Sequence, residues 1–459
     1  MVAVASPENP LRVAVVGSGP SGFYATEALL KSGRTVLVDM YERLPVPYGL
    51  VRSGVAPDHP KLKQAILVYD KIARSSGFRF IGNVTVGRDL VVAEMRDAYH
   101  AIIFTSGAES DRRLGIPGED LPGSHTATEF VGWYNGHPDY HDRSFDLSQE
   151  VAVIIGQGNV AIDVCRILAK TVDELKHTDI VEHALEALSE SRIREIHVIG
   201  RRGPTQAKFT NKELRELGEL ADADAIVNPV DLTLNAESET ELVDKNNTVA
   251  AKNIEIFRSF ATQAGSNKRR HVYIHFFEGP VELRGRERVE AIVLEKNRLE
   301  GPAFNQVARG TGETTELQCG LVFRSIGYKG MPIAGVPFDE RKGVFPNVDG
   351  RMRDGNGAVP GLYCAGWIKR GPTGIIGTNR ADSVATVNSL LADLAQLNAG
   401  QNKAGAEALY PLLANRGVRF FSFEDWLKID AAEIERGEPK GKPREKFTRV
   451  AEMLNVLAS

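Results

Sequence analysis

The stretch "LRVAVVGSGPSG", residues 11–22, determines the expected fold of this chain. A short apolar run precedes a glycine-rich turn, and a helical pattern follows to about residue 32. In such a turn Gly17 permits the tight bend, Gly19 lets a pyrophosphate approach the backbone, and Gly22 lets the helix pack close to the strand. The spacing therefore predicts a strand, a phosphate-binding turn and a helix, the opening of a parallel α/β unit.

A second stretch, "VAVIIGQGNVAIDV" at residues 151–164, repeats this arrangement. Gly156, Gly158 and Ala161 fit the variant of the pattern that ends in alanine. Two such turns predict two dinucleotides in one chain. Hydride transfer between two nucleotides requires their rings to meet, so we expect the two sites to face each other across a domain interface.

The residues that end the following strands distinguish the two nucleotides. Glu42 ends the strand predicted at 35–43, where a carboxylate accepts both ribose hydroxyls, and this turn suits FAD. The strand at 193–200 ends instead in Arg201 and Arg202, whose guanidinium groups bind a 2′-phosphate through charge-assisted hydrogen bonds. The second turn thus suits NADPH. The alternative is that the two arginines are a solvated charge pair and the turn is only a connection.

The rest of the chain indicates that one domain is inserted into another. A proline-rich loop at 44–61, a helix at 62–76 and a buried strand at 99–105 precede a break in the pattern at 108–135. After a buried strand at 317–327, the stretch 359–383 returns to the style of the first unit. We expect an α/β fold of two Rossmann-like dinucleotide-binding domains: a discontinuous FAD-binding domain, 1–107 and 331–459, and an NADPH-binding domain, 108–330, inserted into it.

Composition narrows the function classes. With 42% hydrophobic residues and a formal net charge of -4, the chain has the composition of a soluble globular protein without a nucleic-acid-binding surface. No apolar run reaches the length of a membrane span and no targeting segment is recognisable, so we expect a cytoplasmic protein. Its three cysteines lack a C-x-x-C motif, which argues against a redox dithiol, an iron–sulfur cluster of its own or a metal site. We expect a monomer, because no long apolar surface helix is evident.

Five motifs together resemble one family: "VGSGPSG", "LPVPYGLVRSGVAPDHPK", "GQGNVAIDV", "GRRGPTQAKFTNKELREL" and "AGWIKRGPTGIIGTN". They are similar to those of the NADPH:ferredoxin reductases of the adrenodoxin reductase family, mainly its bacterial members. The likeness runs from about residue 11 to the C-terminal tail. It implies an FAD-containing ferredoxin–NADP+ reductase that passes electrons from NADPH through FAD to a small, acidic iron–sulfur ferredoxin.

The resemblance also implies which residues bind each cofactor. For FAD they are Gly17, Gly19, Pro20, Gly22, Glu42, Leu50, Val86, Trp367, Gly374, Ile375 and Ile376. For NADPH they are Arg112, Gln157, Gly158, Asn159, Val160, Arg201, Arg202, Glu213 and Gly374. A helix that begins at 374–376 and faces the flavin would also stabilise the negative charge of the reduced ring. Trp367 has plain core packing as its alternative, and Glu213 a favourable place in the first turn of a helix.

His59 and Asp163 occupy positions that the family links to proton handling, although a lone histidine in a loop is more often structural. For the acidic partner we expect a basic surface that steers association. Candidates are Lys268, Arg269 and Arg270 in "SNKRRH" (266–271), for which a solvated loop is the alternative, and Lys369 and Arg370 near the flavin.

Two other functions remain open at this point. One is an NADPH-dependent flavin enzyme that reduces a small molecule or oxygen, such as a monooxygenase, but no sequence feature requires a substrate cavity. The other is a non-catalytic flavin-binding subunit. The intact second turn and its arginines argue against it, because a scaffold has no use for a coenzyme that comes and goes.

Overall fold

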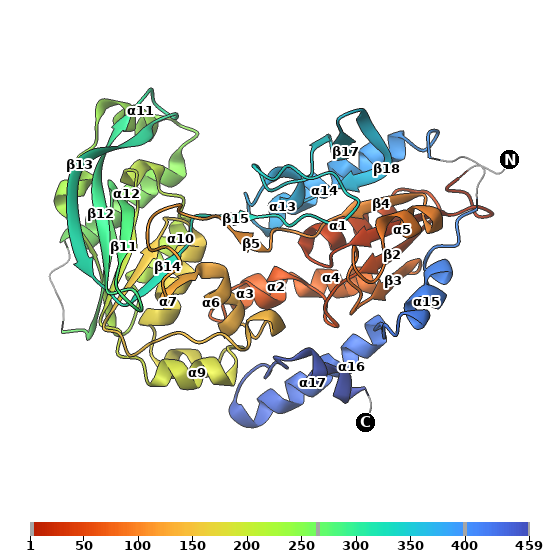
Figure 1. Ribbon diagram of the computed structural model, residues 1–459, viewed down its shortest axis with the longest axis horizontal. Coiled ribbons are helices and arrows are strands. Elements are labelled where there is room, and N and C mark those ends of the chain that lie inside the picture. Colours follow the sequence, from red (N-terminus) through yellow and green to blue (C-terminus); the bar gives the residue numbers. More distant parts are fainter. Residues whose placement is uncertain (1–3, 263–266, 398–401, 458–459) are drawn as a thin grey trace.

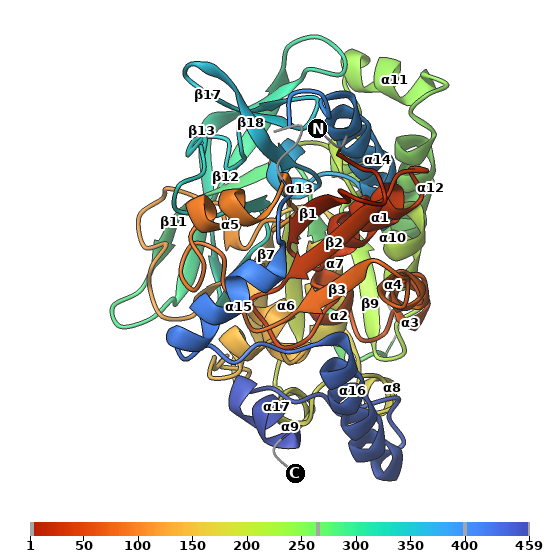
Figure 2. The same ribbon diagram turned by 90° about the vertical axis from the view of Figure 1, so that its right-hand side faces the viewer.

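The computed structural model describes residues 4–262, 267–397 and 402–457, and two parallel sheets with helices packed against them dominate it (Figure 1). Each sheet and its helices form one lobe, and Figure 2 looks onto the lobe that contains the first sheet. We call the lobes the seven-stranded unit and the six-stranded unit after their sheets.

The sheet of the seven-stranded unit takes strands from both halves of the chain. In spatial order the strands are β16 (Asn347–Val348), β17 (Arg351–Asp354), β18 (Gly357–Cys364), β4 (Ala101–Phe104), β1 (Leu11–Val16), β2 (Val36–Tyr41) and β3 (Phe78–Ile81). The strands from β18 to β3 are parallel, and β16 and β17 are antiparallel additions at one edge.

The sheet of the six-stranded unit is parallel throughout and lies between β4 and β16 in the sequence. In spatial order its strands are β6 (Ser124–Thr126), β14 (Leu321–Arg324), β7 (Val151–Ile155), β8 (Glu195–Ile199), β10 (Arg270–His275) and β9 (Ala223–Val227). The predicted fold class, two Rossmann-like units with one inserted into the other, is thereby confirmed. The residues at which we divided the domains stay a prediction.

Two small antiparallel sheets complete the strands. A three-stranded sheet of β11 (Glu278–Arg284), β12 (Ala291–Glu300) and β13 (Val307–Gln318) extends the six-stranded unit. The second pairs β5 (Ser110–Asp111) with β15 (Tyr328–Lys329). Because these two strands belong to the outgoing and returning connections, the crossings between the units run side by side (Figure 1).

Helices cover the sheets of both units. Those of the seven-stranded unit are α1 (Pro20–Leu30), α2 (Leu50–Ser53), α3 (Pro60–Lys63), α4 (Ile66–Ala73), α5 (Val92–Ala98), α13 (Trp367–Arg370), α14 (Ile376–Ala392), α15 (Ala406–Asn415), α16 (Phe423–Gly437) and α17 (Val450–Val456). Those of the six-stranded unit are α6 (Ala127–Tyr134), α7 (Asn159–Ala169), α8 (Val172–Leu175), α9 (Glu182–Ser189), α10 (Asn211–Leu217), α11 (Ala236–Val243) and α12 (Thr248–Thr262). Separate hydrophobic cores lie under the two sets.

Three predicted elements differ from the structure. The helix expected at 62–76 is split into α3 and α4, with residues 64 and 65 in a turn. The crossing expected at 108–135 contains the buried helix α6, which begins at a capping box of Thr126 and Glu129. The strand expected at 317–327 is the end of β13 followed by β14, which belong to different sheets.

Candidate functional site

The carboxyl ends of four strands lie level at one edge of the seven-stranded sheet. Val16 pairs with Tyr41 and Phe104, and Phe104 pairs with Cys364. The residues that follow these strands, among them Gly17 and Glu42, therefore gather at one edge. In open parallel α/β sheets this edge is where ligands bind.

The three glycines of the first turn are glycines for different reasons. Gly17 has φ 108°, and a Cβ there would lie 2.6 Å from the carbonyl oxygen of Thr105. A Cβ at Gly22 would overlap the carbonyl oxygen of Gly17, so only glycine allows helix α1 to pack this close to the turn. Gly19 has extended backbone, φ -78°, and its Cβ would meet no atom within 4 Å. The space beside Gly19 fits a pyrophosphate that approaches the backbone.

Glu42 and the proline-rich loop close over this turn. Glu42 Oε2 accepts hydrogen bonds from the amide (3.1 Å) and the hydroxyl (2.7 Å) of Ser18, so the carboxylate lies beside the turn. The amide of Tyr48 donates to the carbonyl of Ser18 at 3.1 Å. A Cβ on Gly49 would come within 3.0 Å of Gly19 Cα, which places the loop directly above the turn.

Tyr48 holds this loop in a strained conformation. Its φ of 85° is unusual for an aromatic residue and costs about 1–3 kcal/mol. The buried ring is fixed from several sides: its hydroxyl donates to Asp70 and accepts from Trp426 Nε1 at 3.3 Å, and its face packs against Phe23. Backbone strain maintained by such packing is typical of ligand-binding segments.

The segment from Trp367 to Ile376 brings a helix N-terminus to the same edge. The Trp367 indole donates to the carbonyl of Thr373 at 3.2 Å. Its ring stacks on Tyr328, with the ring centroids 5.6 Å apart. Gly374 has φ 83°, and Ile375 is 66% exposed at the start of α14. The remaining predicted flavin contacts differ in exposure: Leu50 is 41% exposed and Val86 is buried.

The second turn repeats the geometry of the first. Ile155 pairs with Ile199 and Arg324, so Gly156 and the residues after β8 share one edge of the six-stranded sheet. Gly156 has φ 130°, and a Cβ there would overlap the carbonyl oxygen of Ser325. Gly158, in contrast, is extended (φ -127°), and its Cβ would meet nothing within 4 Å. This space also fits a pyrophosphate.

The side chains of the second turn brace the protein rather than point at a ligand. Gln157 Nε2 donates to the carbonyl of His275 at 2.7 Å, and Asn159 Oδ1 accepts from the amide of Thr210 at 2.9 Å. Val160 packs on the hydrophobic core. We therefore expect the backbone amides at the start of α7 to bind the phosphate.

Arg201 and Arg202 follow β8 at this edge, and within the described part of the chain neither forms an ion pair with a carboxylate. Burial, and then the charge of Arg201, lower the pKa of Arg202. The two positive charges repel each other, and an anion bound between the guanidinium groups would offset this repulsion. Arg112 lies on the crossing just after β5, where it lines a cavity of about 370 Å³ together with Arg113, Arg143 and Arg324.

A buried charge cluster joins the loop before α3 to helices α7 and α10. His59 Nε2 lies 2.7 Å from Glu216 Oε2. The Arg166 guanidinium binds Asp58 through two hydrogen bonds, of 2.9 and 3.0 Å, and lies 2.8 Å from Asp163 Oδ1. The structure thus brings the two predicted proton-handling residues, His59 and Asp163, into one cluster around Arg166.

Burial raises the pKa of Asp163 to about 6 despite the neighbouring Arg166, and the charge of Glu213 adds to the rise. Glu213 also accepts the hydroxyl of Thr210 at 2.9 Å in the first turn of α10. Sequence reasoning overlooked Arg166 and Glu216. The spacing of Asp163 and Arg166, three residues apart on one helix, was the available signal.

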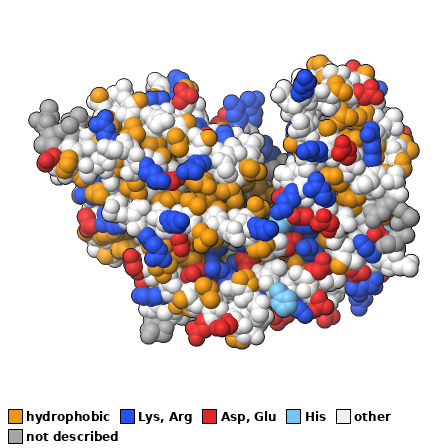
Figure 3. Space-filling view, turned by 180° about the vertical axis from the view of Figure 1, so that it is seen from behind, with side chains coloured by type: hydrophobic (Ala, Val, Ile, Leu, Met, Phe, Trp, Pro, Cys, Tyr) orange, Lys and Arg blue, Asp and Glu red, His pale blue; other side chains and the backbone are white. Residues whose placement is uncertain are grey.

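The predicted basic residues are largely paired. Arg269 and Arg270 bind Asp222, and Lys268 lies 3.6 Å from Asp224; Ser266 of this run is outside the described residues. Lys369 and Arg370 both bind Asp382. The space-filling view shows a notch between the two lobes with basic side chains along it (Figure 3). Among the residues described, none of the helices combines the length and the apolar composition that a membrane span requires.

Comparisons with known proteins agree with this geometry. Residues 11–209 match the family model described as pyridine nucleotide-disulphide oxidoreductase. The chain is 45% identical over 459 residues to NADPH-ferredoxin reductase FprA of Mycobacterium tuberculosis, covering 98% of this chain and 99% of that protein. It is 47% identical to the mitochondrial NADPH:adrenodoxin oxidoreductase of Homo sapiens, covering 98% and 92%. A solved structure, Mycobacterium tuberculosis FprA in complex with NADPH, superposes with a TM-score of 0.93 at 44% identity and covers 98% of this chain and 100% of that one.

Proposed function

We propose, from the premise that this chain belongs to the family of NADPH-ferredoxin and NADPH:adrenodoxin reductases, that it is an NADPH:ferredoxin oxidoreductase. One observation carries the assignment. Gly19 lies at the carboxyl edge of the first sheet and Gly158 at that of the second. Both have unstrained, extended backbone, and a Cβ added at either would meet no atom within 4 Å. The chain thus provides two pyrophosphate cradles, which fit the dinucleotides FAD and NADPH.

Bound at the first turn, FAD would supply the chemistry of this enzyme, since a flavin takes two electrons from NADPH and returns them singly to an iron–sulfur partner. The turn from Gly17 to Gly22, with Pro20 at the start of α1, holds the pyrophosphate, and Glu42 accepts the ribose hydroxyls. Leu50, Val86 and Trp367 would line the ring. The backbone at Gly374, Ile375 and Ile376 would present the positive end of α14 to it and so stabilise the negative charge of the reduced flavin.

The second turn would hold NADPH with groups of both units. The backbone from Gln157 to Val160 binds the pyrophosphate, and Arg201 and Arg202 select the 2′-phosphate. Arg112, Glu213 and Gly374 complete the expected contacts, with Gly374 near the nicotinamide. The two arginines support this assignment because their charges lie together and, among the residues described, neither forms an ion pair with a carboxylate.

We also propose that His59 and Asp163 handle protons near the flavin. Asp163, with a pKa of about 6, changes protonation close to neutral pH, and Arg166 stabilises its ionised form. Glu216 orients the His59 ring through Nε2. A largely buried pair of groups, one of them with a pKa near neutral pH, suits proton transfer.

The partner we propose is a small, acidic, iron–sulfur ferredoxin, met by a monomeric reductase in the cytoplasm. Three cations, Lys268 to Arg270, lie against the two carboxylates Asp222 and Asp224, and Lys369 and Arg370 share Asp382, so each group retains positive charge. This charge, and the basic side chains along the notch in Figure 3, support electrostatic steering of an acidic partner.

The test is anaerobic cytochrome c reduction by the purified holoenzyme and NADPH, with and without a small iron–sulfur ferredoxin. We expect strong acceleration by the ferredoxin at low ionic strength that weakens as salt rises. If NADPH bleaches the flavin but the ferredoxin changes nothing, the acceptor is a small molecule. If NADPH does not bleach the flavin, the chain is not an NADPH-dependent enzyme.

A further inference from the structure

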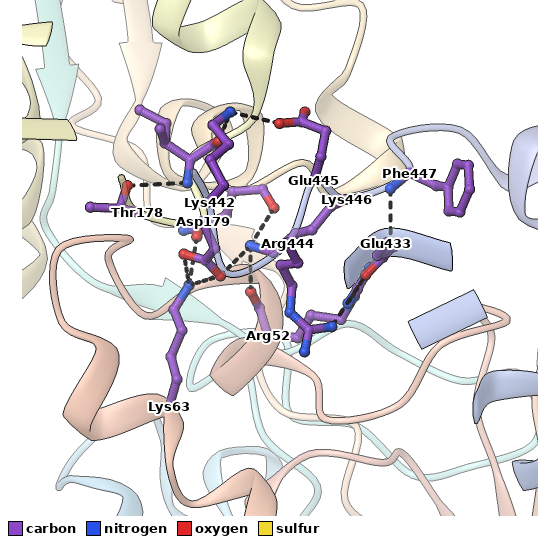
Figure 4. A network of polar contacts seen from close by, with 12 residues as sticks. Arg52, Lys63, Thr178, Asp179, Glu433, Lys442, Arg444, Glu445, Lys446 and Phe447 are labelled. Atoms are coloured by element: carbon purple, nitrogen blue, oxygen red, sulfur yellow. Dashed lines mark hydrogen bonds and ion pairs between the residues drawn. The ribbon is translucent and has the colours of Figure 1, made fainter. Parts of the chain in front are cut away.

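The C-terminal segment leaves the seven-stranded unit, contacts the six-stranded unit and returns. Helix α16 belongs to the core of the first unit through buried Trp426 and Ile429, and Met453 of α17 belongs to the same core. Between them, residues 438–449, which we call the C-terminal strap, lie against the six-stranded unit (Figures 1 and 4). Sequence reasoning gave this segment no role.

Lys442 and Glu445 attach the strap to the segment that runs from α8 to the first residue of α9. Lys442 Nζ donates to the carbonyl of Ile180 at 2.9 Å and to Glu445 at 2.6 Å. Glu445 in turn accepts from the amide of Glu182 at 3.0 Å. Lys442 and Glu445 are both buried, and in the seated strap each charge is balanced by the other and by these contacts with the six-stranded unit.

Lys446 contacts both units through its ammonium group. Its ammonium lies 2.9 Å from Asp179 Oδ2, donates to the carbonyl of Asn135 at 3.1 Å, and donates to the carbonyl of Arg52 at 3.3 Å. Asp179 and Asn135 belong to the six-stranded unit, whereas Arg52 belongs to α2 of the other unit. One buried ammonium therefore satisfies acceptors on both sides of the interface (Figure 4).

A second lysine reaches the same carboxylate from the seven-stranded unit. Lys63 of α3 binds both oxygens of Asp179 at 2.7 Å. It lies four residues after His59 in the segment that also carries Asp58. Arg52 is fixed from the other side, because its guanidinium binds Glu433 of α16 at 2.5 and 2.9 Å with both side chains buried.

Gly136 allows the close approach of these elements. It has φ 74°, and a Cβ there would overlap a methyl group of Val181 and lie 3.2 Å from Thr448 and 3.6 Å from Lys446 Cβ. The strap, the end of α6 and the loop around Val181 thus meet without space between them. Sliding one unit on the other would leave buried charges without partners, a far larger penalty than the loss of apolar contact.

We propose that Lys446 is a positioning residue for electron transfer: together with Asp179 and Lys63 it fixes the angle between the two units, and so the approach of the nicotinamide to the flavin. The effect on electron transfer rests on the proposed function, whereas the angle between the two units can be measured without any coenzyme. A displacement of about 1 Å at reacting groups can slow a reaction about 100-fold, so a small change of angle has a large effect.

The test compares Lys446→Met with Lys428→Met. Methionine keeps the length of the side chain and leaves Asp179 balanced by Lys63, so the chain is expected to fold. Lys428 is a suitable control because it lies on α16 and its side chain is 65% exposed. Should Lys446→Met yield no folded protein, Lys446→Gln, which keeps one donor, takes its place.

The first readout is the distance distribution between spin labels at Lys31→Cys and Val243→Cys, two exposed positions on different units, with the native cysteines buried. We expect a broader or shifted distribution for Lys446→Met than for wild type and Lys428→Met. An unchanged distribution overturns the inference.

The second readout is anaerobic reduction of bound flavin at saturating NADPH. We expect a rate lowered about 10-fold or more in Lys446→Met, with flavin content and affinity for 2′,5′-ADP within about twofold of wild type. A lowered rate with unchanged distances overturns the inference, because Lys446 would then act by another route. A wild-type protein that NADPH does not reduce refutes the proposed function and leaves the distance test standing.

Discussion

Replacing Gly158 by alanine tests whether the second turn holds a pyrophosphate. Its backbone is extended, φ -127° and ψ 176°, which alanine adopts readily, and the added Cβ meets no atom within 4 Å. The substitution therefore introduces neither strain nor overlap into the ligand-free protein. It places a methyl group in the space that a coenzyme phosphate would occupy.

The two effects have opposite signs. A glycine replaced by alanine at a compatible position stabilises a fold by about 0.4–1 kcal/mol, because the unfolded chain loses freedom. Displacing the phosphate from the amides of α7 removes at least one charge-assisted hydrogen bond, about 1.5–3 kcal/mol, which raises the Kd for NADP+ about 10- to 150-fold. Flavin content should not change.

The assay is titration of the purified holoenzyme with NADP+, followed by thermal unfolding without coenzyme. Gly355→Ala is the matched control, since its Cβ also meets nothing within 4 Å but it lies between β17 and β18, away from both turns. An NADP+ affinity within twofold of wild type would refute the phosphate assignment. A clear loss of stability would refute the inference that the space at Gly158 is open.

Three further substitutions separate the roles proposed above. Gly19→Ala should lower the FAD content of the purified protein without lowering the thermal stability of the flavin-free chain, because its Cβ also meets nothing within 4 Å; full flavin content would contradict the first cradle. Arg201→Ala should weaken NADPH binding by about 1.5–3 kcal/mol and leave NADH almost unaffected, as measured by kcat/KM for each coenzyme; equal losses would refute the 2′-phosphate contact. Burial raises the pKa of Asp163 from 3.8 to about 6, so the folded chain binds more protons than the unfolded chain between these values and stability falls as pH rises through them. Asp163→Asn should therefore reduce the fall in the free energy of unfolding by up to about 1.4 kcal/mol per pH unit, measured by urea unfolding at several pH values. An unchanged dependence of that free energy on pH would show that Asp163 is not the titrating group.

The glycine turns and their partner strands were predictable because their chemistry is local. A turn needs particular residues at fixed spacing, and the residue that ends the next strand lies beside it through the register of a parallel sheet. Glu42 and the Arg201–Arg202 pair were identified in this way. The structure places each at the sheet edge that carries the corresponding glycine turn. The insertion was predictable for a related reason, since the pattern at 359–383 matched that of the first unit.

The charge clusters were not predictable because their members are far apart in the sequence. Asp179 and Lys446 form a buried ion pair across more than 250 residues, and no periodicity links them. For the same reason the run at 268–270 was predicted as a basic patch, although Asp222 and Asp224 lie against it in the fold. The split between α3 and α4 was not predicted either; Lys63, the last residue of α3, binds Asp179 of the other unit.

The order of strands in the first sheet has a consequence for synthesis of the chain. Strand β4 ends at Phe104, but its neighbour β18 begins only at Gly357, after the whole six-stranded unit. At about 5–20 residues per second, the ribosome needs about 13–50 s to supply the missing strand. Throughout that time β4 exposes an unpaired edge, and the six-stranded unit becomes able to fold only near its end, once β14 (Leu321–Arg324) has been made. We therefore expect nascent chains that stop before residue 357 to aggregate or to occupy a chaperone.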